Sequence, residues 1–274
     1  MKKTRLDIAL TQRGLTTSRS QSESLIKLGK VTVDSRVVMK PGHFVGSGED
    51  IKLSSDDQYV SRAGLKLASV TDTLKLNFKD KIVLDVGSST GGFTDYALRH
   101  GAKKVYAVDV GTEQLHPSLR SNKRIELHEK TDIRSVYEIA PDHLPLRLRS
   151  GSSTSTVHHL LNDIPDIVLI DVSFISLRDI LPHIHKNLSG SGTQIIAMVK
   201  PQFEAGKDQT NKGIIKNESI RRQILRDFEN WAKSWFVIAN KRDSDIAGAK
   251  GNQERFYLLS HSGSDPEKQT LRKK

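Results

Sequence analysis

The sequence predicts an α/β protein in which a doubly wound, parallel sheet follows a small α+β module. Short apolar runs alternate with helical stretches from residue 82 onward, which is typical of repeated strand–helix units. A glycine-rich segment at 85–95 separates the first of these runs from a helix, as at the strand-to-helix turns of such sheets. The first 40 residues differ from the rest in their charge and in their mixture of short helices and strands. Two domains are therefore expected.

The large domain is expected to begin with a helix-like segment, Tyr59–Ala68, ahead of its first strand. The expected parallel strands are 82–86, 105–109, 125–128, 167–171 and 194–199. Phe236–Ala239 and Phe256–Leu259 are expected to form a hairpin that completes the sheet, with its last strand antiparallel to the others. The polar segment 141–163 has no apolar period and is expected to be a mobile surface loop.

The first 57 residues are expected to form two short helices followed by strands. Leu6 and Leu10 lie four residues apart on the first helix, and Ser18 and Gln21 form a capping box for the second, which Gly29 is placed to end. The expected strands are Val31–Val33, Arg36–Val38 and Ile51–Leu53, with a turn at Asp34-Ser35 between the first two. The polar residues 54–58 are expected to link this module to the sheet.

The composition limits the class of protein. The chain has 274 residues, no cysteine and no run of eighteen apolar residues, so disulfides, thiolate metal sites and spanning helices are not expected. Its start lacks the apolar core of a signal peptide, which predicts a soluble, cytoplasmic protein. A net charge of +11 and a pI near 9.7 favour a polyanionic partner such as RNA, although a solvated basic surface is the simpler alternative. Residues 1–40 carry nine basic and three acidic side chains, which is more than half of this excess.

The glycine-rich segment carries the strongest functional signal. Gly87, Gly91 and Gly92 follow Asp85 in the pattern D-x-G-x-x-x-G-G, which is neither the dinucleotide pattern G-x-G-x-x-G nor a P-loop. The pattern is similar to the opening loop of S-adenosylmethionine-dependent methyltransferases. Asp109 ends the next strand, where a carboxylate would grip the ribose diol of such a cofactor. If the glycine-rich loop is taken alone, it could equally be a tight strand-to-helix turn that binds no cofactor.

Further polar residues lie at the carboxyl edge of the expected sheet, where parallel strands bind ligands. Asp171 and Lys200 follow two of these strands, and Glu254 precedes a strand that begins at this edge if it runs antiparallel. Methyl transfer to a ribose hydroxyl requires removal of the hydroxyl proton, which a neutral lysine can accept. Burial or a second cation nearby, for which Lys66 is the candidate, favours the neutral form of a lysine. Taken singly, each residue could be an ordinary exposed strand end.

Residues 1–57 resemble the S4 RNA-binding domain, in Arg5-Leu6-Asp7, in Ser18-Arg19 and in Leu25–Val33. The resemblance implies that basic residues of the two helices face RNA and hold phosphates, namely Arg5, Arg19, Lys27 and Lys30. The family usually has Asn-Gly at the hairpin turn, and Asp34-Ser35 is expected to change the turn type more than the RNA surface. A small packing module with solvated lysines is the alternative.

The large domain resembles the hemolysin-A-type (TlyA) branch of the FtsJ-like ribosomal RNA 2′-O-methyltransferases. The resemblance is carried by Tyr59–Leu67, the glycine turn, Ala107–Gly111, Asp171–Leu177, Val199–Glu204 and Gly251–Glu254. It implies a Rossmann-like domain that uses S-adenosylmethionine, cytidine of ribosomal RNA as the target, and four catalytic residues: Lys66, Asp171, Lys200 and Glu254, with Lys200 as the base. The segment at 141–163 is longer than is usual in the family. This departure puts the expected substrate contacts near the segment in doubt, but not the four catalytic residues.

The same resemblance assigns the residues that hold the cofactor. They are Asp85, Gly87, Ser88, Gly91, Gly92, Phe93, Asp109, Val110 and Asp132. Asp132 has two interpretations, because it either holds adenine after the third strand or caps the next helix. Arg62 joins the expected RNA-binding residues. No metal site is expected, because the chain lacks cysteine and its paired histidines have no carboxylate cluster nearby.

The chain thus divides into an S4-like domain at 1–57, an FtsJ-like methyltransferase domain at 58–263 and a basic tail at 264–274. The predicted partners are ribosomal RNA or ribosomal subunits, with no membrane, and the oligomeric state is left open. One alternative is a non-catalytic, S4-type ribosome-assembly factor, against which the intact glycine turn and the four catalytic candidates argue. The other is a hemolysin, against which the lack of a spanning or strongly amphipathic segment argues.

Overall fold

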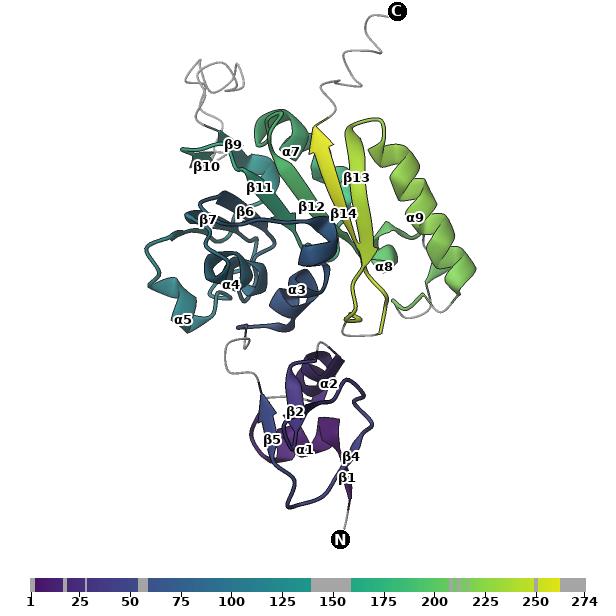
Figure 1. Cartoon of the computed structure of the whole chain (residues 1–274). Coiled ribbons are helices and arrows are strands. Elements are labelled where there is room, and N and C mark those ends of the chain that lie inside the picture. The colour runs from purple at the N-terminus through teal and green to yellow at the C-terminus, as the bar shows by residue number, and fades with distance from the viewer. Residues whose placement is uncertain are drawn as a thin grey trace, which may run out of the picture.

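The computed structural model describes residues 3–16, 19–27, 29–53, 59–138, 159–206, 209–210, 213–215, 217–248 and 251–261. These residues form a small amino-terminal domain and a larger domain around a seven-stranded sheet (Figure 1). The observed elements confirm the predicted fold class, an α/β domain preceded by an α+β module. The predicted link at 54–58 and the predicted tail at 264–274 lie outside the described residues.

The small domain packs two helices against short strands. These elements are β1 (Thr4–Arg5), α1 (Leu6–Gln12), α2 (Arg19–Lys27), β2 (Val31–Val33), β3 (Arg36–Val37), β4 (Phe44–Val45) and β5 (Ile51–Leu53). Strands β3, β2 and β5 form an antiparallel sheet in that order, which contains the predicted hairpin and the predicted closing strand. Strand β1 pairs with β4, and the sequence revealed neither of these two strands. Leu6 and Leu10 are fully buried, and Gly29 follows α2 with a φ of +70°. The predicted cap, Ser18, lies outside the described residues.

The turn between β2 and β3 corrects one expectation. Asp34 and Ser35 have φ angles of 48° and 65°, and two positive angles in a two-residue loop define a type I′ turn. Val33 pairs with Arg36 across the turn. An Asn-Gly pair favours this same turn, so the prediction of a changed turn type was wrong. The twist of the strands selects the turn, and an aspartate tolerates its positive φ better than most residues do.

A buried carboxylate joins the two helices of the small domain. Asp7 has no exposed side-chain surface, and it accepts two hydrogen bonds from Arg5, at 3.0 and 2.8 Å, and one from Arg19 at 2.9 Å. Burial alone would raise the pKa of Asp7, but the hydrogen bonds from the two arginines outweigh it and lower this pKa to about 2. The two arginines are therefore oriented by Asp7, with 40% and 55% of their side chains still exposed.

The Asp7 cluster is expected to make the small domain sensitive to acid. The pKa of Asp7 is lower in the folded than in the unfolded chain, so its contribution is present above about pH 4 and is lost as the pH falls toward 2. The shift corresponds to about 2 kcal/mol. Asp7→Asn should lose about this much at pH 7 and converge with the wild type near pH 2. Urea unfolding between pH 7 and 2, followed by amide exchange in α1, measures this difference, and parallel curves at all pH values would contradict it.

The large domain alternates strands with helices. Its first half contains α3 (Arg62–Leu74), β6 (Ile82–Val86), α4 (Gly92–Arg99), β7 (Lys104–Val108), α5 (Pro117–Arg120), β8 (Ile125–His128), η2 (Ile133–Ser135) and β9 (Val136–Glu138). Its second half contains β10 (His159–Leu161), β11 (Ile167–Ile170), η3 (Leu177–Asp179), α7 (Leu181–Asn187), β12 (Gln194–Val199), α8 (Pro201–Glu204), α9 (Glu218–Ala232), β13 (Phe236–Asp243) and β14 (Arg255–His261). Each predicted strand is present, although some bounds differ.

The sheet has the order β13-β14-β12-β11-β6-β7-β8. Strands β12, β11, β6, β7 and β8 are parallel, whereas β14 is antiparallel to β12 and to β13. The carboxyl ends of the parallel strands therefore share one edge with the start of β14. The predicted closing hairpin is confirmed, and with it the side of the sheet on which Glu254 lies.

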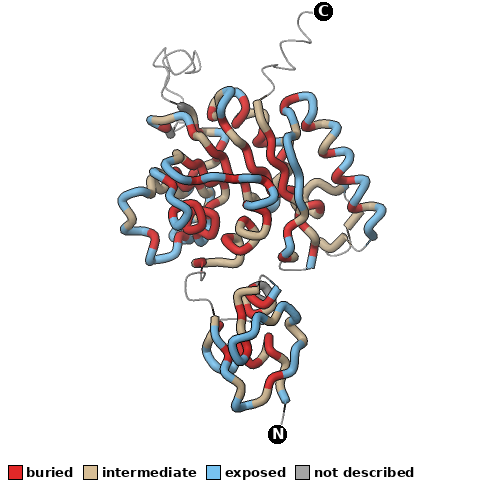
Figure 2. Tube along the Cα trace, in the orientation of Figure 1, coloured by how far each residue is buried: buried red, intermediate tan, exposed pale blue. Residues whose placement is uncertain are grey.

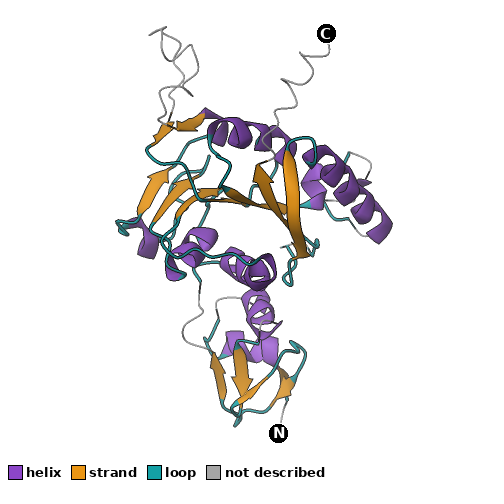
Figure 3. Cartoon of the chain, turned by 45° about the horizontal axis from the view of Figure 1, so that its top comes forward, coloured by secondary structure: helices purple, strands orange, loops and turns teal. Residues whose placement is uncertain are grey.

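The sheet is buried on both faces, as expected for parallel strands covered by helices. On β6, Val83 belongs to the apolar cluster that contains the buried side chains of α3 and α4, and Leu84 belongs to the cluster that contains those of α7 and α9. On β12, Met198 and Val199 divide between the two clusters in the same way. Figure 2 shows the resulting band of buried residues through the middle of the domain, and Figure 3 shows helices on either side of the strands.

One part of the predicted surface loop at 141–163 is ordered as a strand. His159–Leu161 forms β10, which pairs in parallel with β9, and Leu161 is fully buried. The polar sequence around this strand concealed it, because three residues are too few to show a period. Residues 141–158 lie outside the described residues. Among the helices that the structure describes, none is long and apolar enough to cross a membrane.

Candidate active site

The glycine turn follows β6 and brings the backbone close to the neighbouring strand. Gly87 has a φ of +80°, and a Cβ atom on it would lie 2.8 Å from the carbonyl oxygen of Asp171. Gly91 has a φ of +88°, and a Cβ there would lie 2.6 Å from side-chain atoms of Leu115 and Leu119. Both positions therefore require glycine, for conformation and for space. Gly92 begins α4 directly after them.

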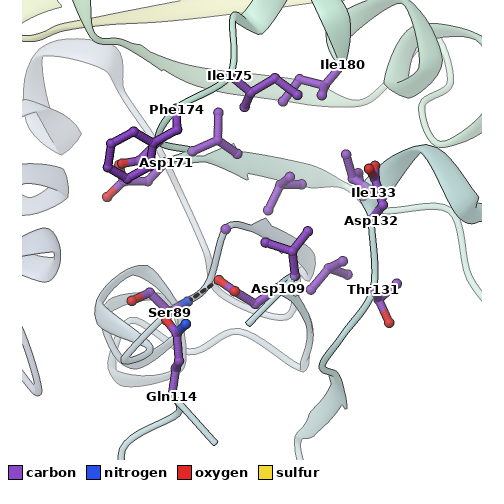
Figure 4. A pocket seen from close by; sticks show the side chains of 16 residues that line it. Ser89, Asp109, Gln114, Thr131, Asp132, Ile133, Asp171, Phe174, Ile175 and Ile180 are labelled. Atoms are coloured by element: carbon purple, nitrogen blue, oxygen red, sulfur yellow. Dashed lines mark hydrogen bonds between the residues drawn. The ribbon is translucent and has the colours of Figure 1, made fainter. Parts of the chain in front are cut away.

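Asp109 fixes the turn from the end of the next strand. Its carboxylate accepts a hydrogen bond from the backbone N–H of Ser89 at 2.8 Å and one from Gly111 at 2.6 Å. Figure 4 shows Asp109 directed toward Ser89 at the base of a cavity. Each carboxylate oxygen has a second lone pair. Asp109 can therefore accept further hydrogen bonds from a ligand with a pair of hydroxyl groups.

This cavity, which we call the large cavity, has a volume of about 370 Å³. Its lining includes Gly87, Ser89, Val108, Asp109, Val110, Gln114, Thr131, Asp132, Ile133, Phe174 and Ile175 (Figure 4). Asp132 also caps η2 through the backbone N–H of Arg134 and forms an ion pair with its guanidinium at 2.6 Å. Asp132 thus caps η2 and also lines the large cavity. Its position is therefore compatible with both interpretations, the helix cap and a contact with adenine.

A second cavity of about 150 Å³, the small cavity, adjoins the first, since Gly87, Ser89, Asp171 and Ser173 line both. It is also lined by Asp85, Ser88, Phe93 and Lys200, and by Ser61 from the segment before α3. Asp85 is 1% exposed and accepts a hydrogen bond from the Thr94 hydroxyl at 2.6 Å. Burial raises the pKa of Asp85 to about 7.

The expected cofactor residues thus gather around two connected cavities. Of the nine, Gly91 and Gly92 shape the turn without lining either cavity, and the other seven line one or both. Three buried polar atoms of the small cavity have neither a hydrogen bond nor an ion pair among the described residues: Ser61 Oγ, Ser88 Oγ and Asp85 Oδ1. A fourth, Asp171 Oδ1, also lacks a hydrogen bond but pairs with Lys200. Buried polar atoms are normally paired, so the first three indicate a polar ligand. The residues around the two cavities therefore suit a ligand with polar groups.

The four catalytic candidates form two ion pairs at the same edge of the sheet. Lys66 Nζ lies 2.5 Å from Glu254, and Lys200 Nζ lies 2.7 Å from Asp171. The exposed fractions of their side chains are 11% and 3% in the first pair and 11% and 15% in the second. Lys200 also donates to the Ser173 hydroxyl at 2.8 Å. Val199 pairs with Arg255, so Lys200 and Glu254 are the next residues across the same ladder.

The arrangement differs in one respect from the expected set. Each lysine has its own carboxylate partner, Glu254 for Lys66 and Asp171 for Lys200. Lys200 lines the small cavity together with Asp171, whereas neither Lys66 nor Glu254 lines it. The pair formed by Lys200 and Asp171 is therefore the one that can contact a ligand in the small cavity.

Two aromatic residues near this pair were not singled out from the sequence. Phe174 is 92% exposed, has a φ of +65°, and lines the large cavity. Its ring lies 5.2 Å from that of Phe203, and Lys200 Nζ lies 5.9 Å from the Phe203 ring. An exposed ring held in an unfavourable backbone conformation is typical of functional sites. The sequence analysis noted the segment Asp171–Leu177 that contains Phe174, but a sequence alone does not show which residue of a loop is exposed.

Glu204, at the end of α8, is a third residue that sequence reasoning missed. Its buried carboxylate accepts hydrogen bonds from the Ser176 hydroxyl and from the backbone N–H of Leu177, both at 2.7 Å. Burial raises the pKa of Glu204. The carboxylate thus joins the segment after β12 to the segment after β11, which are the segments that carry Lys200 and Asp171.

Glu204→Ala is expected to lower the free energy of unfolding by about 1–3 kcal/mol, because it leaves the N–H of Leu177 without an acceptor in a buried position. Glu204→Gln is the matched control, since its amide oxygen can still accept from that N–H and it removes a buried acid. Thermal and urea unfolding measure the difference. Equal stability of the alanine and glutamine variants would show that the carboxylate does not hold the two segments together.

The expected RNA-binding residues divide between the domains. Arg19 and Lys27 lie on α2, Arg5 ends β1, and Lys30 directly precedes β2. Arg62 is instead the first residue of α3, next to the small cavity. The geometry brings Arg5 and Arg19 together around Asp7, and their role toward RNA stays a prediction.

Comparisons with known proteins agree with this geometry. Residues 59–261 match the FtsJ-like methyltransferase family, and residues 4–51 match the S4 domain. The chain is 32% identical to the 16S/23S rRNA (cytidine-2′-O)-methyltransferase TlyA of Mycobacterium tuberculosis, over 94% of this chain and 90% of that protein. It is 38% identical to the 23S rRNA (cytidine-2′-O)-methyltransferase TlyA of Campylobacter jejuni, over 73% of this chain and 70% of that protein.

Other relatives carry a different name. The chain is 36% identical to hemolysin A of Brachyspira hyodysenteriae, over 91% of this chain and 97% of that protein. A solved structure from Streptococcus thermophilus, also named for hemolysin, superposes with a TM-score of 0.64 at 35% identity, over 96% of this chain and 90% of the other. The sequence matches, the two domains and the glycine turn agree, and the chain belongs to the TlyA family of S4-containing, FtsJ-like methyltransferases.

Proposed function

We propose that this protein methylates the ribose 2′-hydroxyl of a cytidine in ribosomal RNA, with S-adenosylmethionine as the methyl donor. The observation that carries the proposal is the position of the Lys200–Asp171 pair in the wall of the small cavity, beside the glycine turn. The names of the relatives from Mycobacterium tuberculosis and Campylobacter jejuni supply the target class.

The residues around both cavities suit this cofactor. Asp109 is placed to accept hydrogen bonds from a ribose diol, and the large cavity has room for an adenine beside Asp132 and Ile133. The glycine turn lets the backbone approach without side chains, and Asp85 and Ser88 offer polar atoms deeper in the site. When bound, S-adenosylmethionine supplies a methyl group on a positively charged sulfur.

The chain's own residues then handle the proton of the acceptor. As the oxygen–carbon bond forms, the hydroxyl proton must leave, and Lys200 Nζ is the group in the cavity wall that is placed to accept it. Asp171 and Ser173 hold this nitrogen from two sides, which fixes the direction of its lone pair. The pair formed by Lys66 and Glu254 anchors α3 to the start of β14 and keeps the edge of the sheet in place.

The small domain would bring the substrate to this edge. Its exposed basic side chains, including Lys27 and the outer faces of Arg5 and Arg19, suit phosphate contacts that position RNA without reading bases. Phe174 offers an exposed ring at the mouth of the large cavity, on which an unpaired base can stack.

Mapping of 2′-O-methyl groups on ribosomal RNA tests the proposal. RNA from cells with and without the gene is expected to differ at a cytidine, and a gene with Lys200→Ala should not restore the modification. Identical maps, together with retained binding to ribosomal subunits, would favour a non-catalytic assembly factor. Leakage of liposomes that survives the Lys200 change would instead favour the activity that the hemolysin names suggest.

A further inference from the structure

A buried asparagine two residues before Glu254 uses both ends of its side-chain amide. Asn252 is only 5% exposed. Its side-chain oxygen accepts a hydrogen bond from the backbone N–H of Ile215 at 3.0 Å, and its side-chain nitrogen donates to the carbonyl of Gly213 at 2.8 Å. The amide therefore pairs with this stretch of backbone as the backbone of a neighbouring strand would. Asn252 lines neither the large nor the small cavity, so its contacts serve the protein's own segments.

The backbone that Asn252 binds belongs to the chain between α8 and α9, which continues from Lys200. The near end of this connection is fixed at Glu204, whose carboxylate accepts two hydrogen bonds from the segment after β11. Its far end is fixed at 213–215 by Asn252, which directly precedes β14. The connection is therefore attached to the segment that carries Asp171 at one end and to the segment that carries Glu254 at the other.

The loop before β14 is folded tightly over the carboxylate of Glu254. A Cβ atom on Gly248 would lie 2.7 Å from Glu254 Oε1, so there is no space for a side chain between this part of the loop and the carboxylate. The backbone N–H of Gly248 donates to the carbonyl of Asn252 at 2.8 Å, which closes the loop. The other carboxylate oxygen, Glu254 Oε2, lies 2.5 Å from Lys66 Nζ. The loop that Asn252 closes therefore sets the direction in which Glu254 faces Lys66.

We propose that Asn252 is a positioning residue for methyl transfer. Its amide joins the chain that follows Lys200 to the loop that holds Glu254, and it thereby fixes the Lys200–Asp171 pair relative to the Lys66–Glu254 pair. The proposal rests on the proposed function. A displacement of about 1 Å in an active site can lower a rate by about 100-fold, even when the changed residue does not contact the reacting atoms. The loss of this connection should therefore slow the chemical step, whereas the cavities keep their lining.

Single-turnover methylation of ribosomal subunits tests this proposal, with the full-length protein in excess and S-adenosylmethionine at saturation. Asn252→Ala is expected to lower the rate constant at saturating protein by about 10- to 100-fold. Asn252→Asp has the same size and can still accept from Ile215, but as a carboxylate it cannot donate to the carbonyl of Gly213, so it should lower this rate constant too. The protein concentration that gives half of the maximal rate, and the affinity for S-adenosylhomocysteine in calorimetry, should stay close to those of the wild type.

Asn240→Ala is the matched control. The side-chain amide of Asn240 donates to the carbonyl of Thr73 at 2.9 Å and so joins β13 to α3, but Asn240 pairs with Leu258, further along β14 than Glu254. This variant should keep the wild-type rate constant. A partly unfolded variant is slower only below saturation when the protein is in excess. A lower rate constant at saturation therefore reports on positioning and not on stability.

The possible outcomes separate this proposal from the proposed function. If the wild type is active and both Asn252 variants reach its rate constant at saturation, the proposal is overturned while the proposed function stands. The same holds if neither variant folds, as judged by urea unfolding, or if Asn240→Ala loses as much rate as they do, because Asn252 then serves the fold alone. If the wild type transfers no methyl group to ribose, the proposed function is wrong and the proposal is overturned with it.

Discussion

Replacing Lys200 with alanine is expected to lower the rate of methyl transfer by about 10²- to 10⁴-fold, the usual contribution of a general base. The amine lies in the wall of the small cavity between Asp171 and Ser173, where a substrate hydroxyl can reach it. The large cavity, with Asp109 and Asp132, is untouched by the change. Cofactor affinity should therefore stay close to that of the wild type, as measured by calorimetry with S-adenosylhomocysteine.

Lys200→Arg separates the base role from the charge. An arginine keeps a positive partner for Asp171, but its guanidinium cannot lose a proton in a protein. Both variants should therefore be inactive in single-turnover methylation of ribosomal RNA, although the arginine variant should be the more stable. Activity near the wild-type level in Lys200→Arg would show that the residue contributes charge and not a proton acceptor.

Breaking the Lys66–Glu254 pair is expected to destabilise the large domain by about 3–5 kcal/mol, since removal of one partner leaves a buried charge uncompensated. Glu254 is the stronger case, because its side chain is only 3% exposed and faces Lys66 at 2.5 Å. Lys66→Met would leave this carboxylate without its cation. Urea unfolding measures the loss, and methylation should fall as well, because α3 and β14 lose their connection at the edge of the sheet.

The double variant Lys66→Met with Glu254→Leu is the matched control. It removes both charges and replaces them with apolar side chains, so it should recover much of the lost stability without recovering activity. The two single changes and the double change form a cycle that isolates the pair. Additive losses of stability in the double variant would show that the two residues do not act as a pair.

Much of the fold followed from the sequence because its signals were local. The predicted strands 82–86, 167–171 and 194–199 each end at the observed strand end or one residue beyond it, and the antiparallel direction of β14 placed Glu254 correctly. In a parallel sheet, the carboxyl ends of all strands lie at the same edge, so residues that follow these strands lie at that edge as well. The gathering of these residues was therefore predictable without any contact information.

The parts that escaped prediction depend on contacts between distant segments. Strand β10 is three residues long and pairs with β9. It follows a long polar stretch of sequence, so its short apolar run was not recognised as a strand. Asp7 pairs with Arg5 and Arg19, and Glu204 accepts a hydrogen bond from Ser176. No regular spacing in the sequence predicts these contacts. Ser61 was not singled out from the sequence, and only the structure shows that it precedes α3 without a cap hydrogen bond and lines the small cavity.

Nucleoside analysis of enzymatically methylated ribosomal RNA tests the central claim most directly. Ribosomal subunits from cells that lack the gene would be incubated with the purified protein and isotopically labelled S-adenosylmethionine, digested to nucleosides and examined by mass spectrometry. The label is expected in 2′-O-methylcytidine, and Lys200→Ala should incorporate it about 10²- to 10⁴-fold more slowly. Label on a base instead of a ribose, or transfer at the wild-type rate without Lys200, would contradict the assignment of the edge formed by Asp171 and Lys200 as the site of 2′-O-methylation.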